Sequence, residues 1–112
     1  MTELVWKDSE KKAARRAYEI AVKAEIADVI EQVKARAAAL ADMDGVAELQ
    51  GYIAERRRNI DRTYDYRYSQ LIVVFARLIL DGRLTLEHLD GLDHEKRQKI
   101  ASLVEFAKGD AP

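Results

Sequence analysis

The segment "VAELQGYIAERRRNIDRTYDYRYSQLIVVFARLILDG" (residues 46–82) has a seven-residue periodicity that decides the expected fold. One set of positions lies seven residues apart: Val46, Ile53, Ile60, Arg67 and Val74. A second set lies four residues after each of these: Gln50, Arg57, Tyr64, Leu71 and Leu78. Alternating steps of four and three place both sets on one side of a helix, as in a coiled coil. We therefore predict one long helix here, ending at Gly82, because glycine commonly follows the last helical residue.

Another long helix is predicted before this segment, over roughly residues 9–41. Its apolar side chains recur at steps of four and three, which keeps them on one side of a helix. They are Tyr18, Val22, Ile26, Val29, Val33, Ala37 and Leu40. Ser9 is the expected N-cap of this helix. The turn "ADMDG" (41–45) separates the two long helices and offers Asp44 as the N-cap of the second.

The C-terminal residues are also predicted to be helical. "TLEHLDGL" (85–92) favours a short helix or turn, and a last helix is expected from a cap at Asp93 to Gly109. The basic turn "EKRQK" (95–99) of this helix is interpreted as a solvated surface. Gly51 interrupts the second long helix, costs about 1 kcal/mol relative to Ala, and is a candidate bend or close approach of helices.

The composition indicates one helical domain spanning residues 1–112. The chain has no cysteine, which excludes disulfides and thiolate metal sites, and its one proline is Pro112. Its most apolar run, "LIVVFARLIL" (71–80), has ten residues, whereas a membrane-spanning helix needs about 20. The N-terminal residues lack the apolar stretch of a signal peptide. We therefore expect a cytoplasmic protein without a membrane partner.

The lengths of the two helices predict a dimer. A helix of about 33 residues is roughly 50 Å long, but a compact domain of this size is only about 35 Å across. Two paired helices also leave apolar side chains on their outer flanks without cover. These are Ile20, Ile30, Ile72 and Ile79. We predict an all-α homodimer with a four-helix stalk, formed by residues 8–82 of each chain, and a small helical head formed by residues 83–109.

Catalytic chemistry has little support in the sequence. His88 and His94 lie six residues apart, which does not place two imidazoles on one helical face as a metal site requires. The chain has no glycine-rich phosphate loop and no Glu-x-x-His pair of the kind found in di-iron bundles. We expect neither an enzyme nor a cofactor or metal ion.

The run "RRRNIDRTYDYRY" (56–68) allows two interpretations. Arginine and tyrosine together are typical of nucleic-acid contacts. The net charge of −1 argues against this reading, as does the expected pairing of Arg57 with Asp61 and of Arg62 with Asp65. The second interpretation is a helical seam, with most arginines solvated or paired. A nucleic-acid-binding dimer remains a distant alternative.

Two arginines of this run need a separate explanation, because Arg57 and Arg67 occupy seam positions where apolar residues are expected. A charge at such a position is costly unless it is paired or reaches a partner. One explanation is that the pair sets the register of the dimer, and the other is direct contact with a different protein. Tyr64 is expected in the core, whereas Tyr66 and Tyr68 are candidates for an exposed protein surface.

Several motifs resemble the fluorescence recovery protein family of cyanobacteria and its relatives outside cyanobacteria. The matching stretches are Trp6 with Glu10, "AYEIAVKAEI" (17–26), "RRRNIDRTYDYRYSQLIVVFARLILDG" (56–82) and "KRQKI" (96–100). Within the third, "IDxxYDxR" (60–67) and "FAxLxxxG" (75–82) are the most specific. The resemblance covers almost the whole chain and implies an all-α dimer of long helices with a C-terminal head.

The resemblance also implies a function without a cofactor. Such a protein binds the photoactivated form of the orange carotenoid protein, mainly through that partner's C-terminal domain, and speeds its return to the inactive form. Arg57 matches a family arginine that matters for the dimer and activity, and Lys99 matches a lysine of the partner-binding head. The family's side chains at four other positions are replaced here by Ala47, Gln50, Gly51 and Val73.

The expected interface residues, toward the second copy or the partner, are Arg57, Asp61, Tyr64, Arg67, Gln50 and Lys99. The replacements near residue 50 leave a second hypothesis open. In that hypothesis the chain is a dimeric helical scaffold with an unrelated protein partner and no activity on a carotenoid protein.

Overall fold

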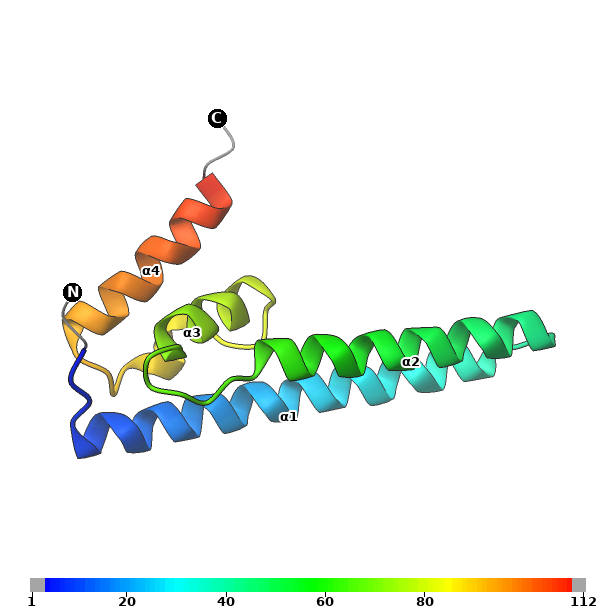
Figure 1. The fold of residues 1–112 in the computed structure, drawn as a ribbon, viewed down its shortest axis with the longest axis horizontal. Coiled ribbons are helices and arrows are strands. Elements are labelled where there is room, and N and C mark those ends of the chain that lie inside the picture. The colour runs from blue at the N-terminus through cyan, green and yellow to red at the C-terminus, as the bar shows by residue number, and fades with distance from the viewer. Residues whose placement is uncertain (1–3, 110–112) are drawn as a thin grey trace.

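The computed structural model describes residues 4–109 and is all-helical over that range. Its elements are α1 (Asp8–Ala38), α2 (Met43–Thr63), α3 (Leu71–Leu80), the short 3₁₀ helix η1 (Leu86–Leu89) and α4 (His94–Gly109). Figure 1 shows α1 and α2 as a long antiparallel hairpin, with α3 and α4 gathered near the N-terminal end of α1. The predicted all-α class and the pair of long antiparallel helices are confirmed.

Both caps of the hairpin differ from the prediction. α1 begins at Asp8, and the Oε1 atom of Glu10 accepts a hydrogen bond from the backbone N–H of Lys7 at 2.9 Å. This carboxylate replaces the expected Ser9 cap. At the turn, the Oδ1 atom of Asp42 accepts from the backbone N–H of Gly45 at 2.9 Å, so Asp42 caps α2 instead of Asp44. α1 ends at Ala38, three residues before the expected boundary.

The prediction of one continuous helix over 46–82 is wrong, because α2 ends at Thr63 and α3 begins only at Leu71. The heptad spacing continues through residues 64–70, but these residues leave the helix. Tyr64, Tyr66 and Tyr68 alternate there, and alternate side chains of an extended chain point to one side. The rings of Tyr64 and Tyr66 pack edge-on against Tyr18 of α1, with centroids 5.6 and 4.8 Å away. This packing holds the non-helical residues 64–67 on α1, and the turn at 68–70 then leads into α3.

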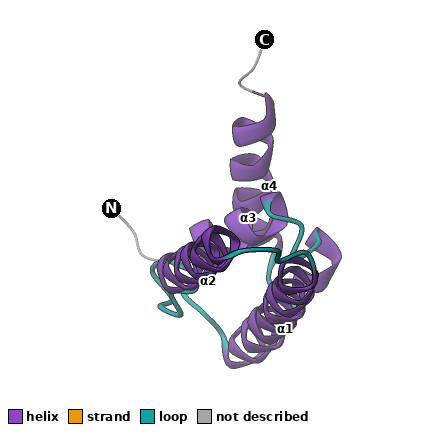
Figure 2. Ribbon diagram, turned by 90° about the vertical axis from the view of Figure 1, so that its right-hand side faces the viewer, coloured by secondary structure: helices purple, strands orange, loops and turns teal. Residues whose placement is uncertain are grey.

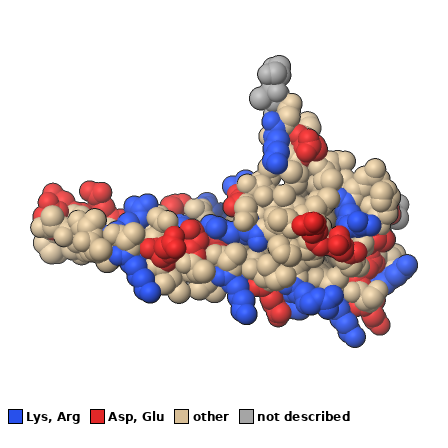
Figure 3. Space-filling model, turned by 180° about the vertical axis from the view of Figure 1, so that it is seen from behind, with Lys and Arg blue, Asp and Glu red and all other residues tan. Residues whose placement is uncertain are grey.

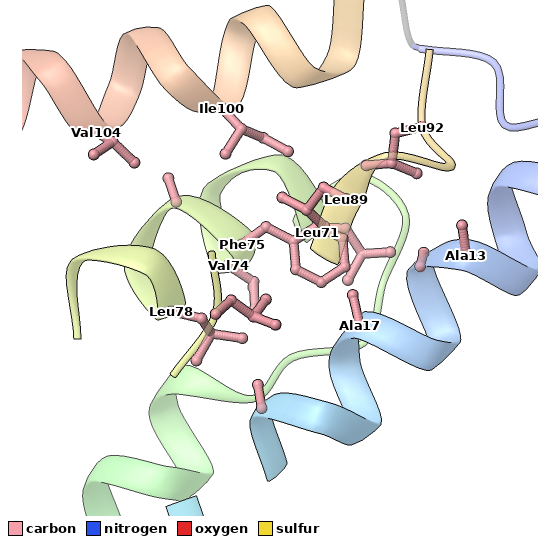
Figure 4. Close-up of a cluster of buried hydrophobic side chains, with 14 of the residues drawn as sticks. Ala13, Ala17, Leu71, Val74, Phe75, Leu78, Leu89, Leu92, Ile100 and Val104 are labelled. Atoms are coloured by element: carbon pink, nitrogen blue, oxygen red, sulfur yellow. The ribbon is translucent and has the colours of Figure 1, made fainter. Parts of the chain in front are cut away.

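The core lies between α3, η1, α4 and the first half of α1 (Figure 4). Its largest fully buried apolar side chains are Phe75, Leu71, Leu78, Leu89 and Ile100. The buried residues of α1 facing them are small: Ala13, Ala14, Ala17 and Ala21. Small side chains allow another segment to approach α1 closely, and the segment after η1 packs directly against them. A Cβ atom added at Gly91 would lie 2.4 Å from the Cβ of Ala13.

Candidate protein-protein interface

The α1–α2 hairpin leaves apolar side chains uncovered beyond the core. None of the 21 residues of α2 is buried. Ile26 and Ile30 of α1 are each 49% exposed, and Val46 of α2 is 39% exposed. Figure 2, which looks along the hairpin, shows α1 and α2 side by side with α4 rising away from them. Exposed apolar side chains spread along a two-helix layer are typical of an interaction surface.

An ion-pair cluster joins the hairpin to the segment after α3. The guanidinium of Arg56 on α2 lies 2.8 Å from the carboxylate of Glu25 and 2.9 Å from that of Asp28, both on α1. Arg83 approaches the same two carboxylates at 3.0 and 3.2 Å. The hydroxyl of Tyr64 lies 3.1 Å from Glu25. Two cations and two anions, all partly buried, thus fix the orientation of the C-terminal helices relative to the hairpin.

The pKa values in this cluster follow from the same contacts. Burial alone would raise the pKa of Glu25, but hydrogen bonds from Arg83 and Arg56 outweigh it and hold the pKa below its ordinary value. The hydrogen bond from Arg56 likewise lowers the pKa of Asp28. Burial and the neighbouring Glu25 carboxylate raise the pKa of Tyr64, so its hydroxyl stays protonated and can donate. The two carboxylates and two guanidinium groups are therefore ionised at neutral pH, while Tyr64 is neutral.

A second cluster joins the start of α4 to the start of α1. The side chain of Lys96 is only 2% exposed, and its Nζ atom lies 3.2 Å from carboxylate oxygens of both Glu10 and Asp93. The same Nζ donates to the carbonyl oxygen of Val5 at 2.6 Å and lies 5.0 Å from the ring centroid of Trp6. A buried lysine with this many partners is well compensated. The expectation that the whole "EKRQK" turn is solvated is therefore wrong for Lys96.

Glu10 completes this second cluster, which we call the α1–α4 clasp (Trp6, Glu10, Asp93 and Lys96). Its Oε2 atom accepts from the backbone N–H of Asp93 at 2.9 Å. Burial would raise the pKa of Glu10, but hydrogen bonds from the backbone of Lys7 and Asp93 and from Lys96 lower it overall. Glu10 is thus a charged, buried residue that links two helix starts 83 residues apart.

The arginine run is largely neutralised by partners other than the expected ones. Arg58 pairs with Glu55 at 2.7 Å, Arg62 approaches the same carboxylate at 3.4 Å, and the Nε atom of Arg67 donates to Asp65 at 2.8 Å. The predicted Arg62–Asp65 pair does not form, because Asp65 lies beyond the end of α2 and outside helical spacing. These contacts leave little of the run available for phosphate groups.

Arg57 and Asp61 are both exposed on α2, and among the described residues they form no ion pair with each other. The expected pair has the basic residue N-terminal to the acidic one, which is the weaker orientation on a helix. Arg57 therefore presents its charge to the surroundings of α2.

Other predicted site residues lie apart within one chain. Gln50 is exposed in the first half of α2, which begins at the tip of the hairpin, whereas Lys99 is exposed on α4, a helix at the opposite end of the molecule (Figure 1). The side chain of Arg67 is 68% exposed in the loop after α2, so its predicted seam position is wrong. Tyr64 is half-buried in the core as predicted.

The other two tyrosines behave differently from each other. Tyr68 is 37% exposed, in agreement with the prediction of a surface position. Tyr66 was also expected on the surface, but it packs on the core between Tyr18 and Tyr68, and its buried hydroxyl has no hydrogen-bond partner among residues 4–109. The alternation of the three tyrosines was the signal that these residues are extended.

Asp93 caps α4 as predicted, because its Oδ1 atom accepts from the backbone N–H of Lys96 at 2.9 Å. Sequence reasoning missed the ion pairs of both clusters, and in particular the roles of Glu25, Asp28, Arg56, Arg83 and Lys96. Their partners lie 28 to 86 residues away in the chain for most contacts. Within residues 4–109, no group of three or more potential ligand side chains is placed to hold a metal ion. No helix in that range is both long and apolar enough to cross a membrane.

Comparison with known proteins agrees with this architecture. The family model described as "Photoprotection regulator fluorescence recovery protein" matches residues 6–104. The curated fluorescence recovery protein of Synechocystis sp. is 31% identical over 101 residues, covering 90% of this chain and 93% of the relative.

Solved structures of two such proteins are also similar. The fluorescence recovery protein of Fremyella diplosiphon has a TM-score of 0.85 and 38% identity, and the match covers 88% of this chain and 97% of that one. The Synechocystis structure has a TM-score of 0.86 and 30% identity, over 90% of this chain and 99% of that one.

The fold, the matched residues and the similar structures define an all-helical regulator of photoprotection. The chain belongs to the fluorescence recovery protein family. The resemblance seen in the sequence motifs is thereby confirmed.

Proposed function

We propose that this chain is a non-catalytic homodimeric regulator of the cytoplasm that binds the photoactivated orange carotenoid protein, or a related domain, and accelerates its return to the inactive form. The observation that supports it most is α2, a helix of 21 residues with none buried, in a chain of this family. A second copy laid against the hairpin would cover it and form a four-helix stalk.

An antiparallel arrangement of the two copies would also account for the scattered interface residues. Gln50 and Lys99 lie at opposite ends of a molecule that extends over 54 Å. In an antiparallel dimer the hairpin tip of one copy lies beside the C-terminal helices of the other. Arg57, near the middle of α2, then lies along the interface. Two equivalent composite surfaces result, one at each end of the dimer.

Acceleration of this kind needs no covalent step. A regulator shifts its partner toward the inactive form when it binds that form, and the transition state leading to it, more tightly than the active form. Exposed charged residues such as Arg57 and Lys99 can supply such contacts. Neither binding of the partner nor acceleration of its return requires a cofactor.

The direct test follows the decay of the photoactivated carotenoid protein in the dark, with and without this chain. We expect the decay rate to rise with the concentration of added dimer. An unchanged rate at excess dimer would remove this function for that partner. It would favour the second candidate, a dimeric scaffold with an unrelated protein partner.

One structural observation favours that second candidate. The residues that replace the family's side chains, Ala47, Gln50, Gly51 and Val73, are all exposed. Val73 is 58% exposed on α3. The replacements therefore change the surface without touching the core.

Arg57 gives a test of the dimer that does not depend on the partner. We expect Arg57→Leu to change dimer affinity by about tenfold, because a charge at an interface sets register at some expense of stability. Sedimentation velocity across a dilution series measures this, with Arg58→Leu as a matched control, since Arg58 already pairs with Glu55. Equal dimer affinities for wild type and Arg57→Leu would contradict the role of Arg57.

A further inference from the structure

The first half of α1 carries cations that the rest of the molecule does not neutralise. Lys12, Arg16 and Lys23 are exposed and form no ion pair with any residue in the described range 4–109. At 3.6 residues per turn they fall within an arc of about 40° on one face of the helix. Arg56, Arg58, Arg62 and Arg67, by contrast, are all engaged by carboxylates. The first half of α1 thus carries a group of cations without ion pairs, whereas the arginine run is largely paired and Arg57 is its exception.

Apolar surface accompanies this charge. A shallow groove of about 480 Å³ runs along α1, lined by Arg15, Arg16, Tyr18, Ile20, Val22 and Lys23, together with Glu19. Ile20 is 40% exposed between the two flanking cations Arg16 and Lys23. The groove therefore has an apolar floor and a rim of three cations and one carboxylate, that of Glu19. We call it the α1 groove.

The start of α1 also has more cations than carboxylates, unlike the chain as a whole. Between Lys7 and Lys23 there are six lysines and arginines and three carboxylates, although the chain as a whole has a net charge of −1. One of those carboxylates, Glu10, is already engaged by Lys96. Figure 3 shows basic side chains, with some acidic ones among them, projecting along the lower edge at the end near the C-terminal helices, and acidic ones at the hairpin tip. The local field at the α1 groove is therefore positive.

We propose that the α1 groove is a second interaction surface, which binds an acidic protein segment carrying apolar side chains at its centre. Carboxylates of the segment pair with Arg16 and Lys23, and its apolar side chains cover Ile20. The α1 groove lies on a different helix from Arg57 and Lys99. Ile20, which was expected from the sequence to be covered by a second copy, is covered by this partner instead, and Arg57 and Lys99 stay free.

The features of the groove favour a protein over other polyanions. Nucleic acid is bound by phosphate-pairing cations together with aromatic rings that stack on bases, but Tyr18 is engaged edge-on with Tyr64 and Tyr66. An anionic bilayer attracts a surface through many cations on a net positive protein, whereas this chain is slightly negative. An apolar floor with few cations fits a short amphipathic segment.

The experiment uses the full chain and a synthetic probe. A helical peptide of about 14 residues, with glutamates flanking a row of leucines, spans the roughly 12 Å of helix between residues 15 and 23. Titration into isotope-labelled protein, followed by amide chemical shifts, locates the site and gives the affinity. We expect shifts centred on residues 12–23 and an affinity that falls with added salt.

Three variants separate the contributions. Arg16→Glu/Lys23→Glu should weaken peptide binding by about tenfold or more. The matched control Lys34→Glu/Lys108→Glu makes the same change in net charge at exposed lysines outside the groove, and should change it less than about twofold. Ile20→Ser should weaken binding several-fold, and this loss should persist at high salt because the lost contact is apolar. If the double reversal unfolds the chain, Arg16→Gln/Lys23→Gln replaces it.

Four results would overturn the proposal. Shifts centred outside residues 12–23 would place the site elsewhere, and equal losses in the test and control variants would show that only net charge matters. Tighter binding of a 14-nucleotide single-stranded DNA, or of vesicles containing anionic lipid, would assign the groove to another class of partner. A weaker dimer for Arg16→Glu/Lys23→Glu in sedimentation velocity would make the groove a self-interface. Failure of the carotenoid-protein assay would not affect any of these measurements.

Discussion

Tyr64 and Tyr66 are two residues apart, and their hydroxyl groups have opposite environments. The hydroxyl of Tyr64 reaches Glu25 and the carbonyl oxygen of Ala21, each at 3.1 Å. That of Tyr66 is buried and has no hydrogen-bond partner within the part of the chain that the structure describes. A buried hydroxyl that is hydrogen-bonded stabilises a fold. A buried hydroxyl without a partner has lost its hydrogen bonds to water and has gained none within the protein.

Removing each hydroxyl should therefore have opposite effects. Tyr64→Phe should lower the free energy of unfolding by about 1 to 2 kcal/mol, because it removes a bond to a charged acceptor. Tyr66→Phe should leave it unchanged or raise it by up to about 1 kcal/mol, since the ring contacts remain. Urea denaturation of both variants measures the difference. A Tyr66→Phe variant as unstable as Tyr64→Phe would show that the Tyr66 hydroxyl has a partner.

Lys96 and Lys99 form a second contrasting pair, one turn apart on α4. Lys96 neutralises Glu10 in the α1–α4 clasp, whereas Lys99 is exposed. Lys96→Met should cost about 3 kcal/mol, because it leaves a buried carboxylate without its cation. Lys99→Met should change stability by less than about 0.5 kcal/mol. Equal stabilities of the two variants in urea denaturation would refute the structural role of the clasp.

At the scale of elements, two glycines show that helix packing decides whether an added methyl group lowers or raises stability. Gly91 approaches α1 so closely that an added Cβ would meet Ala13 at 2.4 Å. Gly51 lies inside α2 with nothing within 4 Å of an added Cβ. The first glycine is required by a contact between elements, and the second only weakens a helix.

Alanine at these two positions should change stability in opposite directions. Gly91→Ala should cost about 1 to 3 kcal/mol through overpacking between η1 and α1. Gly51→Ala should add up to about 1 kcal/mol by raising helix propensity. Thermal unfolding followed by circular dichroism gives both values. A stabilising Gly91→Ala would mean that α1 and η1 can separate without loss.

The same elements show what could be predicted from sequence. The spacing of apolar residues located α1, α2 and α4, because helical periodicity is a local property. The break at 64–70 was missed because the heptad spacing continues across it, while the alternating tyrosines indicate an extended chain. The partners of Glu25 and Lys96 could not be predicted, since their contacts depend on how distant helices pack. The interface residues Arg57, Asp61, Gln50 and Lys99 remain predictions.

At the scale of the whole molecule, the single chain is more elongated than a compact domain of its length. Its radius of gyration is 17.0 Å, whereas a compact domain of this length has about 13 Å. Its stability therefore depends on the two ion-pair clusters, which join α1 to α2 and α1 to α4, as well as on the small core. Carboxylates hold both junctions: Glu25 and Asp28 beside α2, and Glu10 and Asp93 beside α4.

These carboxylates predict the acid response of the fold. All four have a pKa below the ordinary value in the folded chain. A lowered folded pKa gives stability that is complete above the unfolded value, about 4 for Asp and Glu, and is lost as the pH falls through the folded value. The free energy of unfolding should be level between about pH 7 and pH 5 and then decline. Urea titrations at several pH values measure this, and Glu25→Gln should reduce the slope below pH 4.

Trp6 is the chain's one tryptophan, and its position in the α1–α4 clasp makes its fluorescence sensitive to the packing of α4. The indole is 9% exposed, 5.4 Å from the Tyr68 ring and 5.0 Å from the Lys96 ammonium. From Tyr68 the ring contacts continue through Tyr66 and Tyr18 to Tyr64. Light absorbed by these tyrosines therefore reaches the indole by energy transfer. The wavelength of tryptophan emission therefore reports whether α4 stays packed against the start of α1. In the proposed dimer, separation of the two copies would leave this emission unchanged, so one spectrum would distinguish opening at α4 from dissociation of that dimer.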